Sequence, residues 1–131
     1  MSEFRLRGDP GHELTLILLE QGQPHLPSAG DIKLSIRVEC ADFGGERATW
    51  ISRGEWQRFL AEIDALERSR RGSATLEAMS PGALRLALLA QELGSLLLEG
   101  DLGTPHASLR FQFPIAGEHV AQLRALHTWA T

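Results

Sequence analysis

Histidine side chains are the first candidates for chemistry in this sequence, because imidazole is a common metal ligand. Three of the five histidines stand beside Pro or Gly in predicted turns: His12, His25 and His106. His119 and His127 are eight residues apart in a predicted helix, and eight residues rise about 12 Å, too far for two rings to bind one ion. We therefore predict no metal site and no cofactor.

Patterns for catalysis are equally weak. Glu99 and Asp101 alternate with leucines, as on the solvent face of a strand, and Asp64 with Glu67 marks the polar face of a predicted helix. The sequence has no Gly-x-Ser-x-Gly elbow, no phosphate-binding loop ending in Lys-Ser/Thr and no Gly-x-Gly-x-x-Gly fingerprint. We predict no catalytic residues and a protein that is not an enzyme.

The remaining reactive, basic and aromatic side chains fit structural roles. Cys40 is the only cysteine, so one chain can form neither a disulfide nor a cysteine-based zinc site, and a buried, unreactive thiol is expected. The densest basic group stands where it would cap a helix end, and it consists of Arg68, Arg70 and Arg71. The tryptophans could line a ligand pocket, but core packing is favoured for Trp50 and Trp56, whereas Trp129 is the least constrained.

Composition limits the class of protein. With 43% hydrophobic and 23% charged residues, residues 1–131 are expected to form a single domain. A net charge of −4 without a Lys/Arg cluster argues against binding to nucleic acid. No apolar run approaches the roughly 18 residues of a membrane span, and the first residues do not resemble a signal peptide. We expect a cytoplasmic protein with no membrane partner.

Alternating hydrophobicity predicts the strands of the first half. Residues 13–20 form one strand, an exposed loop follows at 21–30, and residues 32–40 alternate as in a half-buried antiparallel strand. Residues 42–45, Asp-Phe-Gly-Gly, predict a tight turn in which the glycines supply positive φ. Residues 46–50 then return as the partner strand.

A helix is predicted between the two halves. Ser52 and Glu55 have the spacing of a capping box, in which each side chain satisfies a free amide group at the helix start. The apolar stripe consists of Trp56, Phe59, Leu60, Ile63 and Leu66. Gly72 is expected to end the helix.

The second half predicts an antiparallel meander and a closing helix. The expected strands are residues 73–79, 83–91, 95–102 and 107–113, and the expected helix is 117–130. Residues 83–93 also suit a helix, although a strand is favoured, and Phe111 and Phe113 should be buried. The fold class is α+β: an antiparallel β-sheet of about seven or eight strands, in two similar halves, packed against two α-helices.

Together these features resemble the WapI-like family of bacterial immunity proteins. The features shared are the alternating strand Ile32–Cys40, the hairpin ending in Trp50, the helix over 55–66, the Gly-bounded meander, and Phe111-Gln-Phe113 before a closing helix. The resemblance implies a non-catalytic binding protein that sequesters a toxin domain, for example that of a nuclease, and blocks its active site. It assigns no residues to the partner contact.

Two alternatives stay open on the residues alone. One is a small enzyme or ligand-binding domain whose cleft the sequence does not show. The other is a homo-oligomeric structural module that pairs through an apolar patch or open sheet edge, for which the Leu-rich meander is a candidate. The net charge of −4 is compatible with a basic protein partner.

Overall fold

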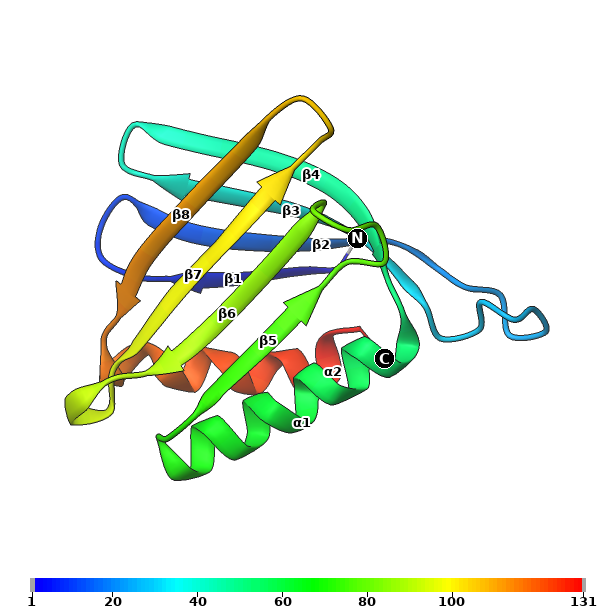
Figure 1. Ribbon diagram of the computed structural model, residues 1–131. Coiled ribbons are helices and arrows are strands. Elements are labelled where there is room, and N and C mark those ends of the chain that lie inside the picture. The colour runs from blue at the N-terminus through cyan, green and yellow to red at the C-terminus, as the bar shows by residue number, and fades with distance from the viewer. Residues whose placement is uncertain (1, 131) are drawn as a thin grey trace.

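The computed structural model describes residues 2–130 and contains two four-stranded antiparallel sheets, each followed by a helical segment (Figure 1). The first sheet contains β1 (Glu3–Arg7), β2 (His12–Gln21), β3 (Ile32–Cys40) and β4 (Phe43–Ile51), in that order. The second contains β5 (Ser73–Glu77), β6 (Leu84–Ala90), β7 (Leu96–Gly103) and β8 (Ser108–Ile115), also in order. The helical segments are α1 (Arg53–Ser69), η1 (Glu92–Gly94), η2 (Gly117–Ala125) and α2 (Leu126–Trp129). The predicted α+β class, with eight strands in two similar halves and two helices, is confirmed.

The strands of the first sheet follow the predicted alternation. Residues 32–40 form β3 with the predicted bounds, and Leu34 and Ile36 on its inner face are fully buried. Ser35 on the opposite face is nevertheless buried, and its hydroxyl donates to Glu46 Oε1 at 2.9 Å. The sequence analysis did not identify β1, a strand of only five residues in which Phe4 and Leu6 point inward.

The predicted turn between β3 and β4 is wrong in position. The chain reverses at Ala41 and Asp42, with Ala41 at φ 54°, and Cys40 pairs directly with Phe43. The two glycines lie inside β4 instead of in the turn. A Cβ on Gly45 would lie 2.7 Å from Leu109 Cδ2 in β8, so this glycine permits close packing of the two sheets.

Helix α1 begins and ends as tertiary contacts dictate. Ser52 caps it by accepting a hydrogen bond from the Glu55 amide at 3.2 Å, but the Glu55 carboxylate accepts from the Glu77 amide and from Arg58, both outside the predicted box. The helix ends before Arg70, which adopts φ 55°, and not at Gly72 as predicted. Four apolar residues of the predicted stripe are buried: Trp56, Phe59, Ile63 and Leu66.

The second sheet forms the predicted meander. Residues 84–90 are a strand and η1 follows, so the helical alternative for 83–93 is excluded. Phe111 and Phe113 are buried as predicted. The closing helix is different, because residues 117–125 are 3₁₀ and only 126–129 are α-helical. The buried side chains there are Val120, Leu123 and Leu126, whose spacing of three matches the three residues per turn of a 3₁₀-helix.

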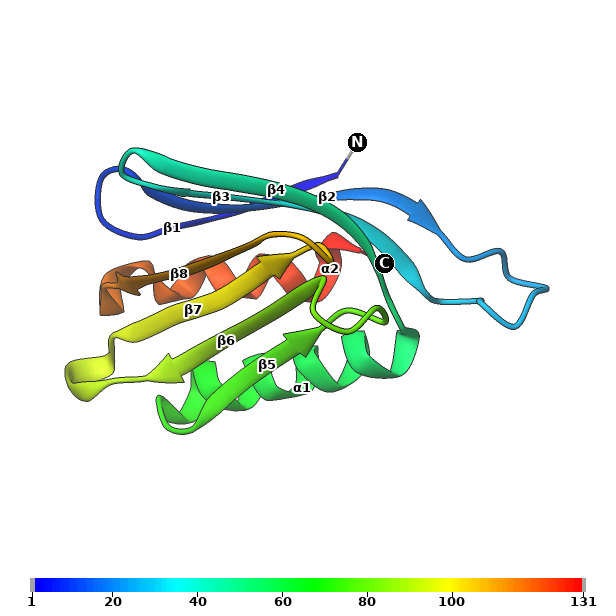
Figure 2. The same ribbon diagram turned by 45° about the horizontal axis from the view of Figure 1, so that its top comes forward.

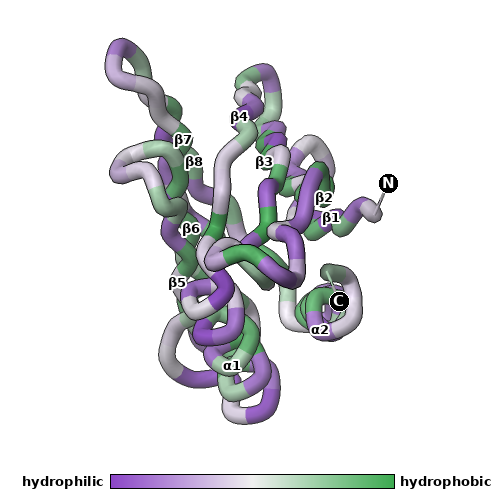
Figure 3. The backbone as a smooth tube through the Cα atoms, turned by 90° about the vertical axis from the view of Figure 1, so that its right-hand side faces the viewer, coloured by the Kyte–Doolittle hydropathy of each residue, from purple (hydrophilic) through white to green (hydrophobic). Residues whose placement is uncertain are grey.

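The two sheets lie as layers that cross one another, with the helical segments packed at their sides (Figure 2). Contacts join β3 with β8, β4 with β7, α1 with β5, and β1 with η2 and α2. Hydrophobic residues recur along the strands of both sheets and along α1 (Figure 3), and both sheets, α1 and the C-terminal segment contribute residues to one buried core. Within residues 2–130, no helix is long and apolar enough to cross a membrane.

Helices also cover one edge of each sheet. At the β5 edge, Glu62 accepts from the Thr75 amide at 2.9 Å and Arg58 donates to the Thr75 carbonyl at 3.0 Å. At the β1 edge, the Gln122 side-chain amide bonds both the amide and the carbonyl of Arg7, at 3.0 and 3.1 Å. These side chains satisfy backbone groups that an edge strand otherwise offers to another chain.

Candidate partner-binding surface

The histidines do not assemble a metal site. Among residues 2–130, no group of three or more His, Cys, Asp or Glu side chains could hold a metal ion. His25 and His106 lie in exposed turns, and His127 is half-buried. His12 and His119 are the only two histidines that line the same hollow, which is described below.

The carboxylates singled out in the sequence make different ion pairs in the structure. Asp101 accepts from Arg110 at 3.0 Å on the outer face of the second sheet, where Glu99 is its neighbour. Glu67 does not lie on a solvated face as predicted, because its side chain is only 10% exposed and pairs with Arg124 of η2. This ion pair ties α1 to the C-terminal segment.

Two of the tryptophans and the arginine group have structural roles. Trp56 is buried, and Trp129 lies with its ring centroid 6.0 Å from that of Trp56 and 6.3 Å from that of Phe4. Trp50 is half-buried on β4. Arg70 donates to the Glu67 carbonyl at 3.0 Å, as expected for a side chain that caps a helix end.

Two turns meet at the opposite end of the first sheet from the long β2–β3 loop (Figure 1). The amide of Ala41, in the β3–β4 turn, donates to the Gly11 carbonyl of the β1–β2 turn at 2.8 Å. His12 and Cys40 are register partners beside these turns. We call this end the turn surface: residues 7–13, residues 37–46, and residues 109–112 of β8.

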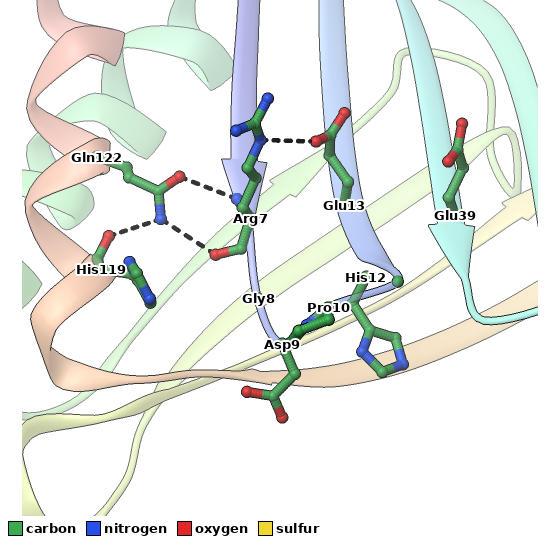
Figure 4. A pocket seen from close by; sticks show the side chains of 10 residues that line it. Arg7, Gly8, Asp9, Pro10, His12, Glu13, Glu39, His119 and Gln122 are labelled. Atoms are coloured by element: carbon green, nitrogen blue, oxygen red, sulfur yellow. Dashed lines mark hydrogen bonds and ion pairs between the residues drawn. The ribbon is translucent and has the colours of Figure 1, made fainter.

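The first hollow of the turn surface has a volume of about 600 Å³ and lies between the β1–β2 turn and η2. Figure 4 shows Glu13 and Glu39 side by side on neighbouring strands, with Arg7 bonded to Glu13 at 2.9 Å. The ring of His12 stacks on Phe113 of β8 at a centroid distance of 5.4 Å, and its buried Nδ1 has no hydrogen-bond partner. Seven of the ten residues that line this hollow are polar or charged, although apolar atoms form most of its exposed wall.

The second hollow, of about 370 Å³, is apolar. It lies between the end of the β3–β4 hairpin and β8, and Val38, Cys40, Leu109 and Phe111 contribute to its wall. Cys40 is partly buried, not fully buried as predicted, and this burial raises the pKa of its thiol. Phe43 stands at the rim with 75% of its surface exposed, the largest exposed fraction of any aromatic ring among the described residues.

The turn surface carries an excess of negative charge. The whole turn surface contains five carboxylates and, with Arg110 of β8, three guanidinium groups, so it carries two of the four net negative charges of the protein. Glu13 and Glu39 are direct cross-strand partners, an arrangement that repels. Arg7 neutralises Glu13, whereas the partner of Glu39 on its other side is Gly44, which has no side chain.

The family model described as the immunity protein WapI-like family matches residues 5–127 of this chain. The chain belongs to this family. Membership implies immunity against a cognate toxin. The matched range contains α1, the whole turn surface and both sheets except the first two residues of β1. The resemblance found in the sequence is thus confirmed.

A solved structure shows a similar fold. One chain of the Trypanosoma brucei MRP1/MRP2 crystal structures superposes with a TM-score of 0.53 and 11% sequence identity, over 98% of this chain and 81% of that one. At this identity the likeness concerns the fold alone. No curated protein matches the WapI-like chain.

Sequence reasoning assigned no partner-contact residues, and it placed Phe43 inside a turn. The sequence does not show the register in which neighbouring strands pair. Only the pairing of Cys40 with Phe43, and of Glu13 with Glu39, places an exposed ring and a carboxylate without a close ion pair at the same end of the sheet.

Proposed function

We propose that this WapI-like protein is a cytoplasmic, non-catalytic immunity protein that binds the toxic domain of a cognate toxin and blocks its active site. The observation that carries the proposal is the family match over residues 5–127. Binding alone suffices for such a role, since a protein partner that covers an active site excludes the substrate sterically.

The charge distribution supports a basic partner. A concentrated negative field accelerates encounter with a positively charged surface and fixes its orientation. A toxin domain that acts on nucleic acid needs a positive surface to contact phosphates, so it would complement an acidic inhibitor.

The alternative of self-association through the meander is not favoured by the packing. Most of its leucines turn inward, although Leu93 in the β6–β7 connection is fully exposed; the buried ones are Leu84, Leu86, Leu88, Leu96, Leu98 and Leu102. The β5 edge of the same sheet is covered by side chains of α1.

The test is co-expression with the toxic domain of the toxin encoded next to this gene. We expect growth to be rescued, and the two purified proteins to form a stoichiometric complex that leaves the toxin chemically intact by mass spectrometry. Rescue with covalent modification or cleavage of the toxin would contradict the non-catalytic role. Killing that is undiminished by co-expression would contradict the immunity role.

A further inference from the structure

We propose that the turn surface is the toxin-docking surface, with Phe43 as its apolar anchor and with Glu39 and Asp42 receiving basic side chains of the toxin. This inference rests on the proposed immunity function and assigns it a location. The occupant is a positively charged segment of the toxin domain that also presents one aliphatic or aromatic side chain.

The apolar part of the argument is the exposure of Phe43. Phe43 is 75% exposed and so contributes little to folding, although the same ring would stabilise a complex by leaving water. The hollow beside it, about 370 Å³ with a mainly apolar wall, lies near the lower end of ligand-pocket sizes and suits a single side chain. An exposed aromatic ring next to an unfilled apolar hollow is the arrangement of an interface hot spot.

The electrostatic part is the excess of negative charge around that ring. Phe43 directly follows Asp42, and Glu39 faces Gly44 across the β3–β4 ladder. Within residues 2–130 neither carboxylate has an ion pair of 4.0 Å or less, and Glu39 is attracted by Arg5 only at longer range. The repulsion between Glu13 and Glu39 disfavours the isolated fold. An arginine or lysine of the partner would fit over the missing side chain of Gly44 and relieve that repulsion.

Other surfaces fit a partner less well. The β1 and β5 edges are occupied by Gln122 and by Glu62 and Arg58. The projecting β2–β3 loop exposes Leu26 at 46%, but its neighbouring acid Glu20 is paired with Lys33. Only the turn surface combines an exposed aromatic ring with an excess of carboxylates.

The test measures binding to the purified toxic domain encoded next to this gene, inactivated by a substitution of its own. Calorimetry and surface kinetics at low and moderate salt compare the wild-type chain with Phe43→Ala and with the double variant Glu39→Lys, Asp42→Lys. Leu26→Ala and Glu77→Lys are matched controls, since they change an exposed apolar side chain and an exposed acid at the other end of the molecule. Thermal unfolding of each variant checks that the fold is intact.

We expect Phe43→Ala to weaken binding by about 10- to 100-fold, mainly through faster dissociation. The double charge reversal should slow association at least 10-fold and abolish most of its salt dependence. Both controls should stay within about twofold of the wild-type affinity, the usual range for residues outside an interface.

Three results would overturn the inference in distinguishable ways. Tight binding by the wild-type chain that neither variant weakens, or that the controls weaken equally, would leave immunity standing and exclude the turn surface. Failure of the wild-type chain to bind or to protect would reject the immunity function together with this surface. A Phe43-dependent dimer in sedimentation would instead assign the ring to a second copy of this chain.

Discussion

Glu39 lies directly opposite Glu13 in the β2–β3 ladder, and among the described residues it has no ion pair of 4.0 Å or less, only a longer-range attraction to Arg5. A carboxylate kept in such a place costs stability, because like charges across a ladder repel. If Glu39 contacts the partner, removing its charge should stabilise the fold and weaken binding, as is usual where a functional residue costs stability.

We therefore predict that Glu39→Gln raises the free energy of unfolding by about 0.3 kcal/mol at neutral pH and low salt. The gain should vanish at about 1 M salt, where charges are screened within a few ångströms. Urea denaturation at both salt concentrations measures it, with Glu77→Gln as the control. A loss of stability in Glu39→Gln would show that the carboxylate makes a favourable contact in the fold.

Cys40 offers a second measurement at the scale of one residue. Burial raises the pKa of its thiol, so less thiolate is present near pH 8 than in an unfolded chain. We predict that iodoacetamide alkylates the native protein several-fold more slowly than the protein in urea, and that the native rate still rises above pH 9. Equal rates in the two states would contradict the burial. Since Cys40 lines the apolar hollow, toxin binding should slow the reaction further.

At the scale of elements, α1 does more than cover the core, because its polar side chains complete the hydrogen bonds of β5. Glu62 accepts from the Thr75 amide and binds Arg58, whose pKa is raised by its hydrogen bonds and ion pairs with Glu55 and Glu62. A strand edge satisfied in this way is closed to pairing with another chain.

We predict that Glu62→Ala destabilises the protein by about 1–2 kcal/mol, since it leaves a partly buried amide without an acceptor. Glu62→Gln, which keeps an acceptor oxygen, should lose less. Urea denaturation gives the energies, and hydrogen exchange at Thr75 should accelerate in the alanine variant only. Unchanged exchange at Thr75 would mean that water replaces the carboxylate.

Elements were predictable where local pattern and tertiary structure agree. The strand Ile32–Cys40 and the helix following Ser52 have the predicted character because their alternation and apolar stripe are long enough to specify a face. Five residues were too few to reveal β1. Gly45 was misassigned to a turn, because its approach to Leu109 depends on packing between two sheets that no local window contains.

The candidate surface could not be predicted from the sequence either, because it too depends on tertiary packing. Net charge is visible in the composition, but its concentration at one end depends on which turns meet. The exposure of Phe43 depends on a two-residue reversal at Ala41 and Asp42, one of which adopts a positive φ that its side chain does not favour. Family resemblance could supply a function, but not this location.

At the scale of the molecule, the two sheets are joined by rings that cross between the halves. Phe113 of β8 is 1% exposed and stacks on His12 of β2. Trp129 at the end of the chain contacts both Phe4 of β1 and Trp56 of α1. A core shared in this way should prevent either half from unfolding alone, which is the expectation for a single domain of this size.

We predict that urea unfolding followed by tryptophan fluorescence and by far-ultraviolet circular dichroism gives one coincident transition. Phe113→Ala should lower both midpoints equally, with a loss of about 3–5 kcal/mol typical of a buried phenylalanine. Tryptophan fluorescence reports on β4, α1 and α2, through Trp50, Trp56 and Trp129, whereas circular dichroism reports on all strands. A fluorescence transition separate from the dichroism transition would show that the two halves unfold independently. The turn surface would then exist only while both halves are folded, because it combines residues of the first sheet with residues of β8.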